Sequence, residues 1–170
     1  MSHPSPGVSI RPLALADVAD MLRIEAEAYP PSLREGEAMF ASRLRLAASY
    51  CLAATRDGQL IAYLIAHGWP ARAPPALGSV LSDGPSEVLY IQDLAVSPAG
   101  RGLKIGEALV AHAFERAADD GLPAAELIAV EGAGRYWRSL GFREAPVSRA
   151  LAGKVASYGP EARWMSRKIG

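Results

Sequence analysis

The stretch most able to do chemistry is residues 88–106, VLYIQDLAVSPAGRGLKIG, where a β-prone run leads through a glycine-rich turn into an apolar helix. Such a turn exposes several backbone N–H groups at a helix N-terminus, where the helix dipole adds attraction for an anion. Glycines let the backbone approach a phosphate closely, and Arg101 adds a guanidinium suited to phosphate contacts. Spacing alone leaves two interpretations open, a phosphate site and a simple bend.

Two common phosphate-binding motifs are missing from this stretch. No Gly-Lys-Ser/Thr sequence closes it, as a P-loop requires. The glycines also lack the spacing of the dinucleotide fingerprint, and no suitable strand–helix–strand unit surrounds them. The segment therefore belongs to neither of these nucleotide-binding classes.

Asp93 is a lone acid in the otherwise apolar run 89–96. A buried charge costs free energy unless it is hydrogen-bonded, paired or used. We interpret Asp93 as a functional carboxylate; the alternative is an aspartate that caps a bulge or faces solvent. The three histidines are scattered and Cys51 is the single cysteine, so we expect no metal site and no intramolecular disulfide.

The elements that position these residues follow from apolar periodicity and turn signals. Strands are predicted at residues 8–11, 51–54, 60–67, 88–96 and 125–130, from 142 onward, and at 163–169. Helices are predicted at 16–29, 35–48, 105–120 and 133–140. Residues 68–85 are rich in Gly, Pro and Ala, and we predict that they form a long loop. Long loops in compact domains are often functional. This order indicates a mixed α/β (α+β) layer architecture.

Composition limits the classes of protein that fit. A length of 170 residues suits one domain, which we place at 8–170 after a flexible N-terminal segment, 1–7. Eighteen basic residues balance eighteen acidic ones, which argues against a nucleic-acid-binding protein. We find no signal peptide and no apolar run long enough to span a membrane, so we expect a cytoplasmic protein without a membrane partner.

Residues 94–110, LAVSPAGRGLKIGEALV, resemble the cofactor motif of the GCN5-related N-acetyltransferases (GNATs): Gln or Arg, two residues, Gly, one residue, then Gly or Ala. Arg101 and Gly106 match the ends of this motif, and Lys104 stands where the family has its central Gly. YWRSLGF, residues 136–142, resembles the aromatic helix of the family, which ends in Gly-Phe. The N-terminal strand and helix are also similar, so that the resemblance spans roughly residues 8–145.

The resemblance implies the GNAT fold, a mostly antiparallel sheet of six to seven strands flanked by about four helices. The sheet would splay beside the strand 88–96, and acetyl-CoA would lie in the notch. By analogy with the family, the backbone of Leu94, Ala95 and Val96 would bind the pantetheine arm. The pyrophosphate would be held by the backbone N–H groups of Arg101, Gly102, Leu103, Lys104, Ile105 and Gly106. We expect position 104 to be entering the helix, where Lys is conformationally acceptable.

The implied activity is that of an N-acetyltransferase, in which a primary amine of a small molecule or protein attacks acetyl-CoA directly, without a metal. Asp93 would bind the substrate ammonium or accept its proton, and the Val96 N–H would contact the oxyanion. The family's usual proton-donating Tyr is replaced by Trp137, one residue after Tyr136. Either Tyr136 protonates the leaving thiolate, or Tyr158 or water does, in which case Tyr136 only packs.

The acceptor would lie between the first two helices, their connection and the loop 68–85, with Glu25, Glu27, Tyr29 and Trp69 as candidate lining residues. The alternative for each of them is an ordinary surface or packing residue. The partners would be acetyl-CoA and an amine, bound by a monomer or a homodimer. The alternative function is a non-catalytic acyl-CoA-binding module on the same fold, which Lys104 and Trp137 favour.

Overall fold

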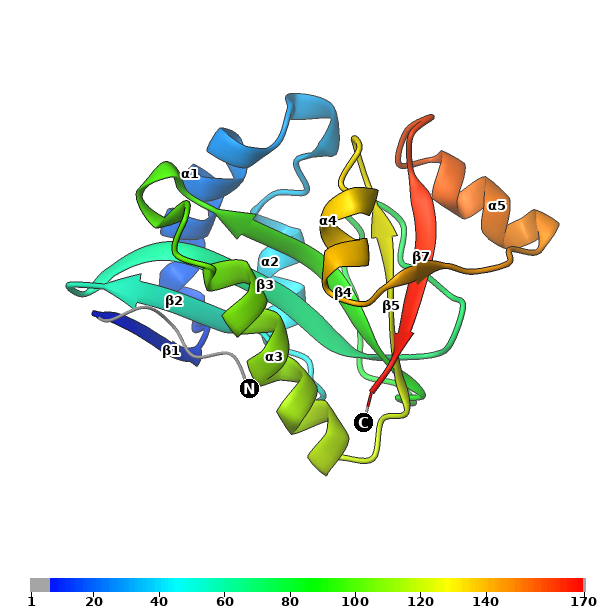
Figure 1. The fold of residues 1–170 in the computed structure, drawn as a ribbon, viewed down its shortest axis with the longest axis horizontal. Coiled ribbons are helices and arrows are strands. Elements are labelled where there is room, and N and C mark those ends of the chain that lie inside the picture. Colours follow the sequence, from blue (N-terminus) through cyan, green and yellow to red (C-terminus); the bar gives the residue numbers. More distant parts are fainter. Residues whose placement is uncertain (1–6, 170) are drawn as a thin grey trace.

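The computed structural model describes residues 7–169, so the flexible segment expected at 1–7 lies outside it except for Gly7. Its centre is a seven-stranded sheet in the order β1-β2-β3-β4-β5-β7-β6 (Figure 1). All pairings are antiparallel except that between β4 and β5, which confirms the mixed, mostly antiparallel sheet. The strands are β1 (Val8–Pro12), β2 (Leu52–Arg56), β3 (Gln59–Trp69), β4 (Val88–Val96), β5 (Ala124–Ala129), β6 (Arg143–Glu144) and β7 (Arg163–Lys168).

Helices cover both faces of the sheet (Figure 1). One face carries α1 (Val18–Ala28) and α2 (Glu37–Leu44), and the other carries α3 (Ile105–Asp119) and α4 (Gly134–Ser139). Short 3-10 turns lie at Leu15–Asp17, Pro31–Leu33 and Pro98–Gly100. Among the helices within residues 7–169, none combines the length and the apolar composition needed to cross a bilayer.

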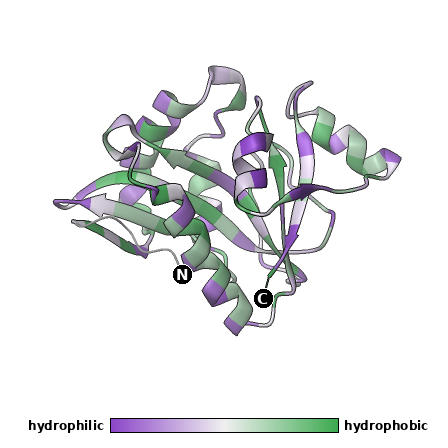
Figure 2. Ribbon diagram, in the orientation of Figure 1, coloured by the Kyte–Doolittle hydropathy of each residue, from purple (hydrophilic) through white to green (hydrophobic). Residues whose placement is uncertain are grey.

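The sheet separates two apolar cores, because successive side chains of a strand point to opposite faces. The α3 side buries Ile105, Leu109 and Ala113, which share one face of that helix at the spacing predicted from the sequence. The other side buries Met21 and Phe40 from α1 and α2. Figure 2 shows the hydrophobic residues concentrated in the central strands, as two covered faces require.

A fifth helix, α5 (Arg149–Ala156), joins β6 to β7 and was not among the predicted elements. Ser148 caps it by accepting a 3.1 Å hydrogen bond from the Leu151 N–H. Leu151 and Val155, one helical turn apart, are buried in a third cluster that includes Tyr158. The helix predicted over 35–48 is also shorter than expected, since α2 ends at Leu44.

The sheet opens between its two parallel strands. β4 and β5 pair only where Leu89, Tyr90 and Ile91 face Ala125, Glu126 and Leu127. Beyond Ile91, β4 stays with β3 as far as Val96, whereas β5 stays with β7. The carboxyl halves of β4 and β5 therefore diverge, as Figure 1 shows. The backbone N–H and C=O groups that these two halves direct toward the gap do not pair with each other.

Candidate active site

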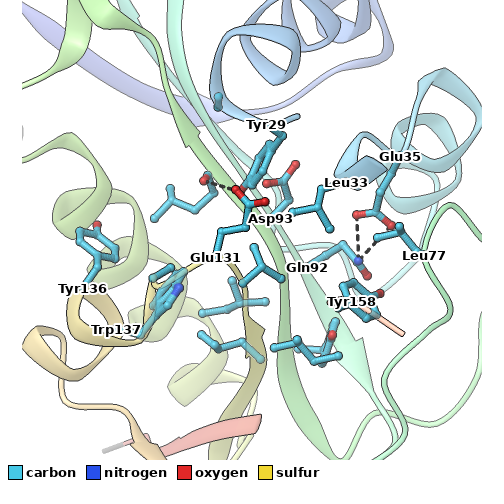
Figure 3. Close-up of a pocket in the computed structure, with 18 residues that line it drawn as sticks. Tyr29, Leu33, Glu35, Leu77, Gln92, Asp93, Glu131, Tyr136, Trp137 and Tyr158 are labelled. Atoms are coloured by element: carbon cyan, nitrogen blue, oxygen red, sulfur yellow. Dashed lines mark hydrogen bonds between the residues drawn. The ribbon is translucent and has the colours of Figure 1, made fainter. Parts of the chain in front are cut away.

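A cavity of about 290 Å³ lies where β4 and β5 diverge. Its walls come from both strands, the end of α1 and the segment after it, α4, the loop before β4, and Tyr158 (Figure 3). Asp93 lies near the middle of the view, with Tyr136 and Trp137 on one side and Glu35 and Tyr158 on the other. The cavity thus joins the strand, the helix and the loop that the sequence analysis connected with function.

Asp93 reaches this cavity because of a β-bulge. Ile65 of β3 faces Asp93 and Ala66 faces Ile91, so Gln92 is the extra residue in β4. Ile91 packs in the core on the α3 side, whereas Asp93 contacts Tyr63 in the core on the α1 side. Without the bulge, residues two apart would share a face. The extra residue therefore turns the carboxylate toward α1 and α2.

The Asp93 carboxyl is buried and has an unusual protonation equilibrium. Only 7% of the residue is exposed, and Oδ2 accepts a 2.8 Å hydrogen bond from the Tyr63 hydroxyl. Burial raises its pKa to about 7; the Tyr29 and Tyr63 hydroxyls oppose this, while the charges of Glu35 and Glu25 add to it. A carboxyl with this pKa can accept a proton at neutral pH, which an ordinary Asp does poorly.

The backbone of β4 presents hydrogen-bonding groups to the gap. The Ser97 N–H donates to the Ile61 carbonyl at 2.8 Å, which fixes the alternation of the antiparallel ladder. The polar groups of Ala95 consequently face Tyr63 of β3, and those of Leu94 and Val96 face away from β3. The Leu94 carbonyl accepts a 3.1 Å hydrogen bond from the Tyr29 hydroxyl on that side. Of the three predicted pantetheine contacts, the geometry favours Leu94 and Val96.

The turn between β4 and α3 contains the residues predicted to hold a pyrophosphate. The Arg101 N–H is used within the turn, because it donates to the Pro98 carbonyl at 3.3 Å. Gly102 has a φ of 81°, and an added side chain there would point into open space. Ile105 and Gly106 form the first turn of α3, where N–H groups have no carbonyl of their own helix to bind. The helix start therefore remains a suitable anion site.

Lys104 does not enter the helix, contrary to our expectation. It precedes α3 in the left-handed conformation, with a φ of 55° and a ψ of 33°, and its side chain is exposed. Glycine adopts this conformation without the clash between Cβ and carbonyl that any other residue suffers. The left-handed backbone at this position explains why the cofactor motif has a Gly there. Lys104 adopts the same conformation with a strained backbone.

Tyr136 and Trp137 form an aromatic corner on α4. Their rings meet edge to face at 5.3 Å, and Trp137 packs on Phe142 in the core at 5.4 Å. The Tyr136 side chain lies over the start of α3, where its hydroxyl would touch a Cβ placed on Gly106. Figure 3 shows the Tyr136 side chain at the edge of the view, well apart from Asp93. Tyr136 thus lies beside the predicted cofactor turn rather than beside the buried carboxylate.

Glu35 faces the cavity from the segment between α1 and α2. Its carboxylate accepts hydrogen bonds from the Gly78 N–H at 2.8 Å and from Gln92 Nε2 at 3.1 Å. Burial raises the pKa of Glu35, which these hydrogen bonds oppose. Tyr158 lies nearby and donates a 2.7 Å hydrogen bond to the Pro75 carbonyl. The segment 70–87 is therefore tied to the cavity at several points.

A family model now identifies the protein class. The model of the acetyltransferase (GNAT) family matches residues 18–142. The chain belongs to this family. No curated protein sequence matches the chain.

Solved structures of GNAT proteins share the fold. The ribosomal-protein-S18-alanine N-acetyltransferase from Escherichia coli is 21% identical with a TM-score of 0.70, over 96% of this chain and 94% of that one. The PaiA N-acetyltransferase from Thermoplasma acidophilum, in complex with coenzyme A, is 15% identical with a TM-score of 0.68, over 95% and 98%. The GphF GNAT-like decarboxylase, in complex with isobutyryl-CoA, is 16% identical with a TM-score of 0.74, over 95% and 100%. These likenesses confirm the predicted GNAT fold.

The predicted acceptor residues of this GNAT separate into two groups. Tyr29 lines the cavity as expected. Glu25 is buried behind it, where it accepts a 2.8 Å hydrogen bond from the Glu35 N–H. Glu27 is exposed and pairs with Arg23, and the Trp69 indole donates to the Ala73 carbonyl at 2.8 Å. The last three are thus structural or surface residues in this arrangement.

The sequence analysis missed three residues of the site: Glu35 and Gln92, which line the cavity, and Tyr63, which lies behind it and donates a hydrogen bond to Asp93. Gln92 and Asp93 form a polar pair within an apolar strand, and this break in the pattern is the local signal of the bulge. Glu35 and Tyr63 carry no local signal, because strand and loop pairings far apart in sequence bring them to Asp93 and Gln92.

Proposed function

We propose that this GNAT is an acyl-CoA-dependent N-acyltransferase that moves an acetyl group from acetyl-CoA to a primary amine by direct attack. The observation that carries the proposal is Asp93: a buried carboxyl with a pKa of about 7, inside the cavity at the diverging ends of β4 and β5. A group of this kind in a cleft is typical of a general base.

Asp93 would prepare the amine. An alkyl ammonium with a pKa of about 10 leaves only about one part in a thousand as free base at neutral pH. The carboxylate binds the ammonium and accepts its proton, directly or through water. The amine nitrogen then bonds to the acetyl carbon and the carbon–sulfur bond breaks. The nitrogen loses two protons in all: one leaves through Asp93 to solvent, and the other balances the proton that the departing thiolate takes up to become the CoA thiol.

The acyl donor would bind along β4 and the start of α3. The backbone of Leu94 and Val96 faces the gap and suits the amides of the pantetheine arm, and the Val96 N–H suits the carbonyl oxygen that becomes negative. The start of α3, the Arg101 guanidinium and the Lys104 ammonium suit the pyrophosphate. Acetyl-CoA supplies the activated acyl group. The complexes of PaiA with coenzyme A and of GphF with isobutyryl-CoA support a donor of this class.

Tyr136 is our candidate for protonating the leaving thiolate. Its hydroxyl lies beside Gly106, close to where the donor would run. Burial and the charge of Glu107 raise its pKa, so the hydroxyl is protonated at neutral pH, as a proton donor must be. The role requires the side chain to turn toward the sulfur when the donor binds.

The test combines binding with turnover. We expect calorimetric titration to give micromolar binding of acetyl-CoA, and release of CoA thiol to depend on added primary amine. Asp93→Asn should abolish most turnover and leave acetyl-CoA binding intact, whereas the exposed control Asp20→Asn should retain both. Release of CoA at the same rate with and without amine would contradict the N-acyltransferase proposal, and would point to hydrolysis or to donor chemistry without an acceptor.

A non-catalytic acyl-CoA-binding module is the second candidate. It is favoured by Trp137 at the position of the family's donor Tyr, and by the strained Lys104 in the cofactor turn. Under this function acetyl-CoA binds, but no amine causes thiol release. The same two measurements therefore distinguish the candidates.

A further inference from the structure

Glu35 is a carboxylate held in a fixed position at the side of the cavity opposite Tyr136 (Figure 3). The donors that hold it are the Gly78 N–H and the Gln92 side-chain amide, both neutral. Among the salt bridges of residues 7–169, none includes Glu35 or Asp93. Two carboxylates therefore face one cavity, and neither is neutralised there by direct pairing with a basic side chain.

A buried arginine fixes the group that holds Glu35. Arg43 Nη2 donates to Gln92 Oε1 at 3.3 Å, and Gln92 Nε2 donates to Glu35. A guanidinium only donates and an ionised carboxylate only accepts, so the amide can satisfy both neighbours in a single orientation. Arg43 is itself fully buried and also donates to Ser42 Oγ and to the Ser79 carbonyl. The β4 bulge thus supports Glu35 as well as Asp93.

The charges around the cavity are predominantly negative. Its lining includes Asp93, Glu35 and Glu131, and no Lys, Arg or His among the described residues. Glu25 adds a carboxyl behind the wall, and burial raises its pKa. Arg43 compensates for one of these charges from behind Gln92, and it does not line the cavity. A phosphate or carboxylate on the acceptor would find no cation there, whereas a second ammonium would find a carboxylate.

We propose that the acceptor is a linear aliphatic diamine or polyamine, and that Glu35 binds its second ammonium while Asp93 receives the amine that reacts. The inference rests on the proposed N-acyltransferase function and specifies its substrate class. Leu33 and Leu77 lie close to Glu35 in the cavity wall (Figure 3), and they suit the methylene chain between the two nitrogens. Glu35 is therefore a specificity-determining residue of the reaction.

A matched pair of amines tests the inference. 1,4-Diaminobutane and butylamine have the same carbon chain and differ in the second amine. With acetyl-CoA saturating, we expect kcat/KM for the diamine to exceed that for butylamine by about tenfold to a hundredfold, the range of one charge-assisted contact. The difference should appear mainly in KM, since Glu35 binds the acceptor and takes no part in bond making. Equal values for the two amines would overturn the inference.

The variant Glu35→Gln provides the second arm. Glutamine keeps the size and an oxygen acceptor for Gly78 but removes the charge. We expect the ratio of kcat/KM for the diamine to that for butylamine to fall to about one, because only the diamine carries the second ammonium that the Glu35 charge would bind. The control Glu27→Gln, which removes an exposed carboxylate outside the cavity, should keep the full preference. If Glu35→Gln lowers kcat/KM for both amines by the same factor, the role of Glu35 is structural, and this result would also overturn the inference.

The outcomes separate this inference from the function on which it rests. If wild type and Glu35→Gln both acetylate the two amines with equal kcat/KM, the N-acyltransferase function stands. Only the assignment of a diamine as the acceptor is then wrong. If no amine supports thiol release although acetyl-CoA binds, both proposals fail together. Preference for an amino acid or for a peptide N-terminus over the diamine would overturn the diamine class and retain the function.

Discussion

The Tyr63 hydroxyl donates a 2.8 Å hydrogen bond to Oδ2 of Asp93 across the antiparallel pair of β3 and β4. Burial favours the protonated carboxyl, and the hydrogen bond favours the carboxylate. The pKa of about 7 is the balance of burial and the charges of Glu35 and Glu25 against the Tyr29 and Tyr63 hydroxyls, so it should move when the Tyr63 hydrogen bond is removed. Two predictions test this balance.

The first prediction concerns the pH dependence of turnover. At saturating amine and acetyl-CoA, we expect kcat to rise with pH about a midpoint near 7, because the carboxylate form of Asp93 accepts the proton. Asp93→Asn should lower kcat by about 10²–10⁴-fold and abolish this midpoint. A variant with wild-type kcat and an unchanged pH profile would show that Asp93 has no part in proton transfer.

The second prediction concerns Tyr63→Phe, which removes the hydrogen bond and keeps the ring that packs on Phe40. Because this hydrogen bond lowers the pKa of Asp93, its loss should raise the midpoint of the pH profile above 7. The control is Tyr50→Phe, which also removes a hydroxyl bonded to an aspartate, Asp120, but outside the cavity. The control should leave the midpoint unchanged; a downward shift in Tyr63→Phe would contradict the assigned cause.

The sequence could indicate Asp93 but not its surroundings, for a physical reason. An acid in an apolar strand is visible locally, as is the amphipathic α3. Glu35 and Tyr63 become part of the site only through contacts with Gln92 and Asp93, which are far from them in the chain. The bulge at Gln92 depends on β3, and one strand alone does not specify a register with its neighbour.

Two further differences have local causes. α5 is short, and its signals, Ser148 followed by two buried residues one turn apart, are weak without the third cluster against which they pack. For Lys104, average helix propensity was the wrong criterion, because the residue lies just before the helix in a left-handed conformation. The backbone geometry at that position determines which residue is suitable there.

The third prediction isolates the cost of that conformation. Lys104→Gly and Lys104→Ala both remove the ammonium, and only alanine keeps a Cβ. We expect the free energy of unfolding of Lys104→Gly to exceed that of Lys104→Ala by about 1 kcal/mol, since the left-handed penalty outweighs the extra chain entropy of glycine. Urea denaturation of both variants measures this difference. Equal stability would mean that position 104 leaves the left-handed region without cost.

The fourth prediction concerns stability and pH. Burial lowers the pKa of His67 to about 4, so between pH 4 and 6.5 the unfolded chain binds a proton that the folded protein does not. This makes stability rise with pH in that window. Asp93 acts in the opposite direction, because the folded protein retains its proton up to about pH 7. Asp93→Asn should therefore show a steeper rise in unfolding free energy from pH 4 to 6.5 than the wild type.

The last prediction concerns Gly106 and Tyr136. A Cβ on Gly106 would meet the Tyr136 hydroxyl and would lie 3.3 Å from Leu94 Cδ2. Gly106→Ala should therefore displace the Tyr136 ring and weaken acetyl-CoA binding. In the double variant with Tyr136→Phe, the collision with the hydroxyl is absent, so calorimetry should show that the two changes together cost less binding free energy than the sum of each alone. Strict additivity would contradict this contact and would place the Tyr136 hydroxyl away from Gly106 in solution.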